Sequence, residues 1–232
     1  MTGYTERKRR FFAVIATCVA LVVTVLFNGD VWQPQAPSGE PAMATNTPAL
    51  ASLEKLEIKG RAPKTHYDRS EFGNGWSEVE GCDMRNIILK RDLTNVAIGE
   101  DCKIVSGVLN DPYTSKTIHF KRGAGSSNDI QIDHVVALSD AWQKGAQQLS
   151  FEKRKQLAND PLELLAVDGS ANQQKGGSDA ASWLPPNKAF RCQYVARQIA
   201  IKLKYGLWVT KAEYDAMKSV LSRCPGQGLP SF

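Results

Sequence analysis

The sequence predicts an α+β domain that contains little strand and much helix. Apolar, β-branched runs bounded by turn residues occupy residues 102–138. Apolar residues recur near the helical spacing of about 3.6 residues over 190–207. Four cysteines between residues 82 and 224 indicate a domain that is stabilised by disulfides in an oxidising compartment.

The composition is that of a globular protein with an appended segment. The chain has 232 residues, and 42% of them are hydrophobic, which suits a packed core and excludes a disordered protein. The formal net charge is +5, but residues 1–27 carry four cations and one glutamate, which leaves +2 for the rest. This excludes a histone-like polycation, so any contact with nucleic acid is expected to be local.

The N-terminal residues predict export. Four cationic residues at 7–10 precede an uncharged apolar run from Phe11 to Phe27. The run has 17 residues, which is long for a cleaved signal and short of the about 20 residues that a bilayer-spanning helix needs. Residues 1–27 are therefore predicted to be a signal peptide, with an uncleaved signal anchor as the alternative. Residues 28–50, rich in Pro, Ala, Ser and Thr, predict a flexible linker, and 51–232 predict the globular domain. The protein is expected to be secreted or anchored to the cell envelope, touching a membrane only through its N-terminal segment.

The first half of the domain is predicted to hold a short helix and a strand pair. Residues 51–58 predict the helix, and 82–93 form an amphipathic stretch whose basic residues face solvent or a ligand. Residues 102–120 predict two strands joined by a turn at Asn110–Pro112, followed by a loop over 121–129.

The second half is predicted to be mostly helical. In order, we expect a strand over 130–138, helical content over 139–160 with a break near Ser150, a short apolar segment over 161–169, and helices over 190–207 and 210–224. The last helix opens with a capping box, Thr210 with Glu213 three residues on.

The cysteines predict two disulfides. Cys18 lies in the export segment, and the other four form an even set with three open pairings. The pairing that closes local loops is Cys82–Cys102 and Cys192–Cys224, and the second bond would join the two C-terminal helices. A zinc site is the alternative. It is disfavoured because no two of these cysteines are close enough to form a zinc knuckle.

Several polar residues follow one another from residue 133 onward. They are Asp133–His134, Asn159, Asn172 and Lys175. Taken singly, each has an ordinary structural role, such as a capping aspartate, a satisfied core histidine, a turn asparagine or a solvated lysine at a helix end. Only their order and context indicate chemistry.

In this order the residues resemble the HNH (ββα-metal) endonuclease motif. In that motif an Asp-His pair ends one strand, an Asn follows near the second strand, and an Asn or His lies on a short helix, often before Lys-Gly. The resemblance extends over residues 61–224, which are similar to secreted bacterial HNH proteins related to the C-terminal domain of GmrSD-type restriction endonucleases. "CDMRNIILKRDL", "DHVVALSDAW" and "WLPPNKAFRCQYVARQIAIK" carry this similarity. The chain departs from the generic motif at Ala137, where a proline is common, and in lacking CxxC pairs.

The resemblance implies a ββα-metal core elaborated with further helices and short strands. It also implies a metal-dependent endonuclease that cuts DNA, with RNA as the alternative, with low sequence specificity and no obligate protein partner. Asp133 and Asn172 would bind one divalent metal, foremost Mg²⁺, with Mn²⁺ or Ca²⁺ as alternatives. His134 would be the general base and Asn159 would orient its imidazole.

Contacts with the substrate phosphate are the least specific prediction. The candidates are Lys175, Arg154, Arg191 and His119. Asp179 is a weaker candidate as a supporting metal ligand. The alternatives to an HNH nuclease are a catalytically silent cell-surface nucleic-acid-binding domain of the same fold, and a metal-free hydrolase of another substrate.

Overall fold

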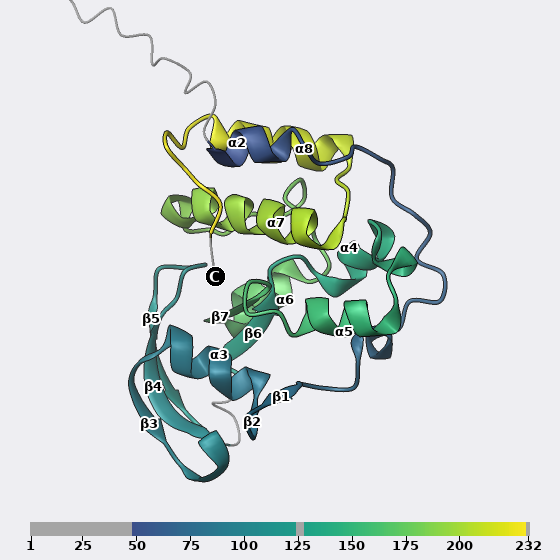
Figure 1. The fold of residues 1–232 in the computed structure, drawn as a ribbon. Coiled ribbons are helices and arrows are strands. Elements are labelled where there is room, and N and C mark those ends of the chain that lie inside the picture. Colours follow the sequence, from purple (N-terminus) through teal and green to yellow (C-terminus); the bar gives the residue numbers. More distant parts are fainter. Residues whose placement is uncertain (1–47, 124–127, 231–232) are drawn as a thin grey trace, which may run out of the picture. The chain divides into compact units, whose positions relative to one another are not determined.

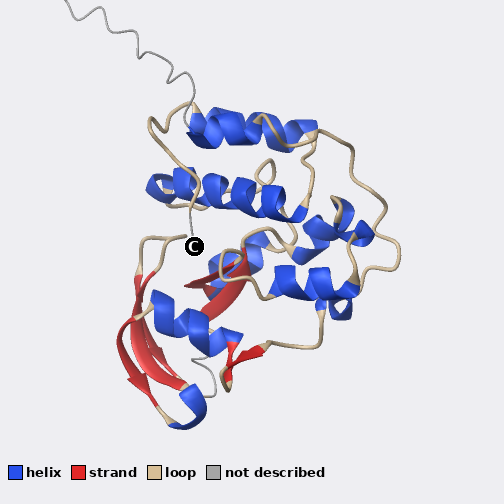
Figure 2. Ribbon diagram, viewed as in Figure 1, coloured by secondary structure: helices blue, strands red, loops and turns tan. Residues whose placement is uncertain are grey.

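A computed structural model describes residues 48–123 and 128–230 and shows helices together with short antiparallel sheets (Figures 1 and 2). The predicted α+β class is confirmed. Among these residues the α-helices are α2 (Pro48–Leu53), α3 (Met84–Asp92), α4 (Leu138–Gln143), α5 (Phe151–Ala158), α6 (Gly169–Lys175), α7 (Arg191–Tyr205) and α8 (Lys211–Leu221). The strands are β1 (Glu78–Val79), β2 (Cys82–Asp83), β3 (Thr94–Ile98), β4 (Ile104–Asn110), β5 (Thr117–Lys121), β6 (Ile130–His134) and β7 (Leu164–Asp168). The 3-10 helices are η1 (Arg69–Phe72), η2 (Glu100–Cys102), η3 (Ala146–Gln148) and η4 (Lys188–Phe190).

The strands form three antiparallel sheets. Strands β3, β4 and β5 pair in that order, β6 pairs with β7, and β1 pairs with β2. The predicted turn between β4 and β5 is present, and the Asp111 carboxylate stabilises it by accepting the Thr114 amide N–H at 2.7 Å. Strand β3 was not predicted, because nearly all its residues are exposed and it shows no apolar alternation.

The two-stranded sheet β6–β7 packs against α3. Ile130 and Ile132 of β6 share a buried cluster with Ile88 and Leu89 of α3 and Leu164 of β7. Removing this apolar surface from water stabilises the packing of the helix on the sheet. The sheet thereby holds the end of β6 in a defined place.

Strand β6 ends at His134, four residues before the predicted end. Beyond it, the backbone amides leave the ladder. The Val135 N–H donates to the Glu163 carbonyl oxygen at 2.9 Å, and the Val136 N–H donates to the Glu163 carboxylate at 3.1 Å. Helix α4 then begins at Leu138.

Helix α6 follows β7 with no intervening loop. The Asp168 carboxylate caps the helix by accepting the Ala171 N–H at 2.8 Å. Gly169 is required at this junction, because a Cβ there would lie 2.0 Å from the Asn128 carbonyl oxygen. Gly176, with φ +50°, ends the helix. The short helix therefore has defined ends, which orient Asn172 and Lys175.

Helices α7, α8 and α2 pack together, with α2 lying along α8 (Figure 1). The predicted cap of α8 is present, since the Thr210 hydroxyl accepts the Glu213 N–H at 3.2 Å. The Glu213 carboxylate instead binds two buried lysines, Lys144 at 2.6 Å and Lys202 at 3.0 Å. The reciprocal half of the capping box is therefore replaced by a tertiary contact.

Both predicted disulfides are confirmed. Cys82 in β2 is bonded to Cys102 in η2, and Cys192 in α7 to Cys224 after α8. The predicted signal segment, residues 1–27, and most of the predicted linker lie outside the described residues. Helix α2 begins at Pro48, inside the predicted linker. Across 48–123 and 128–230, no helix is both long and apolar enough to span a bilayer.

Candidate active site

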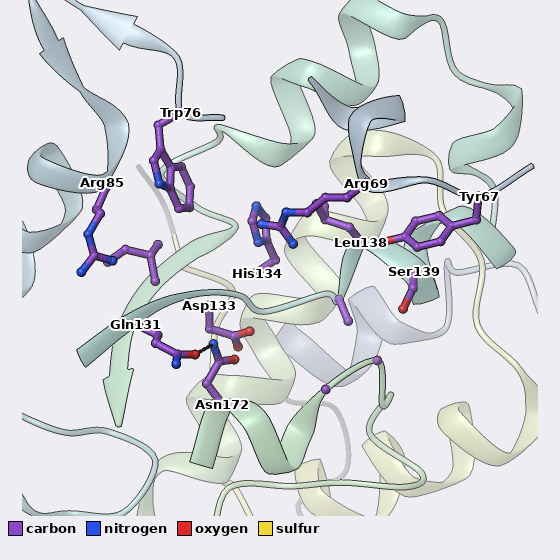
Figure 3. A pocket seen from close by; sticks show the side chains of 14 residues that line it. Tyr67, Arg69, Trp76, Arg85, Gln131, Asp133, His134, Leu138, Ser139 and Asn172 are labelled. Carbon is purple, nitrogen blue, oxygen red and sulfur yellow. Dashed lines mark hydrogen bonds between the residues drawn. The ribbon is translucent and has the colours of Figure 1, made fainter. Parts of the chain in front are cut away.

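A cavity of about 470 Å³ lies beside the end of β6 and the C-terminal half of α6 (Figure 3). Asp133 and His134, although adjacent on a strand, both line it. Both residues lie within the β6–β7 ladder, where neighbouring side chains point to opposite faces. The four consecutive residues Gln131–His134 all line the cavity, so it reaches both faces of the strand. Asn172 of α6 lines the same cavity, so the structure brings together three residues that the sequence motif singles out.

Asp133 is buried and bonded from the side of the protein core. One carboxylate oxygen accepts the Lys175 ammonium at 2.8 Å, and the other accepts the Tyr113 hydroxyl. Burial, reinforced by the Asp133 charge, raises the pKa of Tyr113 well above its ordinary value, so the phenol remains a proton donor. The carboxylate is therefore held in one orientation at the cavity wall.

Asn172 lies opposite Asp133 in the cavity, with its side chain turned toward the carboxylate (Figure 3). Its Nδ2 donates to the Gln131 Oε1 at 2.9 Å, which directs the amide oxygen away from Gln131. Asp133 and Asn172 thus offer two hard oxygen donors of the kind that Mg²⁺ and Ca²⁺ prefer. Among the described residues there is no group of three or more His, Cys, Asp or Glu that could hold a metal. Two protein oxygens would leave the other coordination positions of such an ion to water or substrate.

His134 is fixed as a neutral imidazole. Its Nε2 lies 3.0 Å from the Ala158 carbonyl oxygen, which can only accept, so Nε2 carries the hydrogen and Nδ1 carries the lone pair. Burial, together with the Arg69 charge and against the bond to Ala158, lowers the pKa of His134 from 6.5 to about 3. The Trp76 ring stacks on the imidazole, with centroids 5.7 Å apart and planes inclined by 5°.

Asn159 does not orient the imidazole as predicted. Its Oδ1 accepts the Ser77 N–H at 2.8 Å, and its Nδ2 donates to the Lys155 carbonyl at 3.0 Å. The neighbouring residue, Ala158, holds His134 through its backbone. Asn159 contributes only indirectly, because it holds Ser77, the residue next to Trp76.

The four predicted phosphate contacts do not line the cavity. Lys175 is 1% exposed and bonded to Asp133, so it cannot reach a substrate phosphate. Arg154 pairs with Glu71 at 2.7 Å and ties α5 to η1. Arg191 donates to the Pro185 carbonyl at 2.7 Å, and His119 is exposed on β5.

Asp179 also lies in another setting. It belongs to a buried network of charges at the packing of α4 against α7 and α8, where Lys144 binds Asp140 at 2.7 Å, Asp179 at 2.8 Å and Glu213 at 2.6 Å. Burial alone would raise the pKa of Asp179, but the Lys144 bond and charge outweigh it and hold that pKa below its usual value. Asp179 is therefore a structural residue and not a metal ligand.

Two residues of the cavity wall, Arg69 and Trp76, were not predicted. They come from the segment around η1, which has no apolar periodicity. Figure 3 shows the Arg69 guanidinium directed toward His134, with Arg85 of α3 on the opposite side near Trp76. Arg85 belongs to the stretch 82–93, whose basic residues are predicted to face solvent or a ligand. The one sequence signal for this segment is an arginine and a tryptophan flanking the glycine-rich stretch "FGNG".

Comparison with known proteins gives two matches of high coverage. Residues 83–220 match the family described as GmrSD restriction endonucleases, C-terminal domain. Over 187 residues the chain is 35% identical to an uncharacterized secreted protein of Arthroderma benhamiae. The aligned region covers 79% of this chain and 88% of that protein. No solved structure matches the chain. Asp133, His134 and Asn172 all fall inside the matched range, and the chain belongs to the family of GmrSD restriction endonuclease C-terminal domains.

Proposed function

We propose that this protein is an exported, metal-dependent HNH endonuclease that hydrolyses phosphodiester bonds of DNA, with RNA as an alternative substrate, and with low sequence specificity. The observation that carries the proposal is one cavity that is lined both by a neutral histidine, whose Nδ1 carries the lone pair, and by the oxygen donors of Asp133 and Asn172. Strands β6 and β7 with α6 would form the ββα-metal core. Family membership supports the same reaction class.

Asp133 and Asn172 are the residues that would hold a divalent cation, most simply Mg²⁺. When bound, such an ion supplies charge neutralisation at the phosphate and stabilises the departing oxygen. The protein's part is to present the two oxygens in fixed orientations. The Lys175 and Tyr113 bonds do this for Asp133, and the Gln131 bond does it for Asn172.

His134 would take the proton from the attacking water at Nδ1. The Ala158 carbonyl keeps the hydrogen on Nε2 and stabilises the imidazolium as it forms. The stacked Trp76 ring holds the imidazole plane. The lowered pKa keeps the imidazole unprotonated at neutral pH, and the same shift makes it a weaker base.

Arg69 and Arg85 replace the phosphate contacts that were predicted from sequence. Both line the cavity, and a guanidinium can donate two parallel hydrogen bonds to one phosphate group. Contacts of this kind position a nucleic-acid backbone without reading its bases. They support a substrate defined by its phosphodiester and not by its sequence.

The N-terminal sequence supports export. A cationic head followed by an apolar run is typical of a signal segment, and the Arthroderma benhamiae relative is described as secreted. The two disulfides are stable in an extracytoplasmic compartment.

A plasmid-nicking assay tests the proposal. Wild-type protein should convert supercoiled DNA to nicked circles with Mg²⁺ or Mn²⁺, and a chelator should stop the reaction. His134→Ala should lower the rate by at least about a hundredfold, the usual contribution of a general base. The matched control is His119→Ala, which removes an exposed histidine outside the cavity and should leave the rate unchanged. If the wild-type protein nicks DNA with no divalent metal tested, the enzymatic proposal is wrong.

One observation favours a second candidate, a catalytically silent nucleic-acid-binding domain. Both oxygens of Asp133 already accept hydrogen bonds from protein groups, Lys175 and Tyr113. Binding of labelled DNA, followed by fluorescence anisotropy, would persist in that case without any nicking.

A further inference from the structure

Lys175 lies behind the Asp133 carboxylate, on the side away from the cavity. Its side chain is 1% exposed and does not line the cavity. The ammonium lies 2.8 Å from the Asp133 Oδ1 and 2.7 Å from the His134 carbonyl oxygen. A lysine this deeply buried requires an ionic partner, and Asp133 is that partner. The ion pair is therefore a permanent part of the site.

Helix α6 contributes two residues around Asp133, Asn172 at the cavity and Lys175 in the protein interior. Asn172 and Lys175 are three positions apart and share a helix face. Asn172 is at the cavity, whereas Lys175 is buried and binds the Asp133 Oδ1, and Tyr113 donates to the Oδ2. Asp133 therefore keeps lone pairs toward the cavity while its charge is matched from behind.

The charges of this site do not balance a divalent cation. Asp133 contributes one negative charge and Lys175 one positive charge, and Asn172 and Tyr113 are neutral donors. Arg69 and Arg85 in the cavity wall add further positive charge. An ion beside Asp133 would also be repelled by the ammonium bonded to the same carboxylate. A phosphodiester brings the negative charge that the site lacks.

We propose that Lys175 keeps the affinity of the substrate-free site for divalent cations low, so that cation and phosphodiester bind cooperatively. This inference rests on the proposed function, because it concerns the same site. Lys175 is a positioning residue that acts through Asp133 and does not touch the substrate. By linkage, the phosphodiester must tighten cation binding by the same factor as the cation tightens phosphodiester binding.

Mn²⁺ binding to the full chain, followed by the EPR signal of the free ion at pH 8, tests the role of Lys175. Lys175→Met removes the charge and keeps an unbranched side chain. Lys204→Met removes the charge of a lysine that pairs with Asp160 at 2.6 Å outside the cavity, and it is the matched control. We expect Lys175→Met to tighten Mn²⁺ binding at least about tenfold, or about 1.4 kcal/mol, and Lys204→Met to change it less than about twofold. A folded Lys175→Met protein with unchanged or weaker Mn²⁺ binding would overturn the proposal.

The wild-type protein provides a second test that needs no variant to fold. Mn²⁺ is titrated with the dinucleotide TpT, which carries one phosphodiester charge, and with its uncharged methylphosphonate analogue. TpT should tighten Mn²⁺ binding at least about fivefold, and the analogue should not. An Mn²⁺ affinity unchanged by TpT would overturn the proposal, even if Lys175→Met cannot be folded.

The two proposals fail in distinguishable ways. If wild-type protein never nicks DNA but Lys175→Met still tightens Mn²⁺ binding, the endonuclease function is wrong and the role of Lys175 stands. If nicking is metal-dependent and neither Lys175→Met nor TpT changes Mn²⁺ affinity in the expected direction, only the role of Lys175 is wrong.

Discussion

Acid should destabilise this protein through His134 in a way that one substitution removes. His134 is 7% exposed, and burial is the main cause that lowers its pKa from 6.5 to about 3. Between these pH values the unfolded chain binds a proton that the folded chain does not. Stability therefore falls as the pH drops below 6.5, and the loss is complete near pH 3.

The size of the effect follows from the two pKa values. Each pH unit below 6.5 costs about 1.4 kcal/mol, so at pH 5 the folded protein is destabilised by about 2 kcal/mol through this one group. His134→Gln keeps a side-chain N–H that can donate to the Ala158 carbonyl, but it does not titrate. All other titrating groups are common to the two proteins and cancel in the comparison.

Urea unfolding at pH 8 and pH 5 measures the difference. The loss of unfolding free energy between these pH values should be about 2 kcal/mol larger for wild type than for His134→Gln. Equal losses in the two proteins would mean that His134 titrates normally in the folded state, and the argument for a buried, neutral imidazole would be refuted.

Three further predictions concern the framework of the site. Asn159→Ala removes the acceptor of the Ser77 N–H and should slow single-turnover nicking about tenfold, because Trp76 would no longer be held against His134. The Mn²⁺ affinity should stay unchanged, which distinguishes this effect from damage to the proposed metal ligands. Gly169→Ala should lower the free energy of unfolding by about 2 kcal/mol in a urea titration, because its Cβ would lie 2.0 Å from the Asn128 carbonyl oxygen. The control Gly60→Ala, where no atom lies within 4 Å of the added Cβ, should lower it by less than about 0.5 kcal/mol. Lys144→Met leaves three buried carboxylates without their cation and should lower the free energy of unfolding in urea by about 3–5 kcal/mol. A decrease of less than about 1 kcal/mol would show that this charge network contributes little to stability.

The proposed general base and metal ligands could be predicted from sequence because they follow one another along a short stretch of chain. Asp133 and His134 end a strand, and Asn172 lies on the helix directly after the strand that pairs with it. Local connectivity alone brings such residues together. The role assigned to Asn159 was wrong because a shift of one residue decides whether the side chain or the backbone faces the imidazole.

The sequence by itself determined the α+β class, the capped C-terminal helix and the order of Asp133, His134 and Asn172, because each depends on local propensity or short-range spacing. For the disulfides it favoured the pairing that closes local loops, and the structure decided among the three possible pairings. Tertiary structure alone decided that Lys175 lies in the core against Asp133, and that Arg69 and Trp76 form the opposite wall. These contacts join segments far apart in the chain. Their partners are selected by burial and charge pairing in the folded state, which no local pattern records.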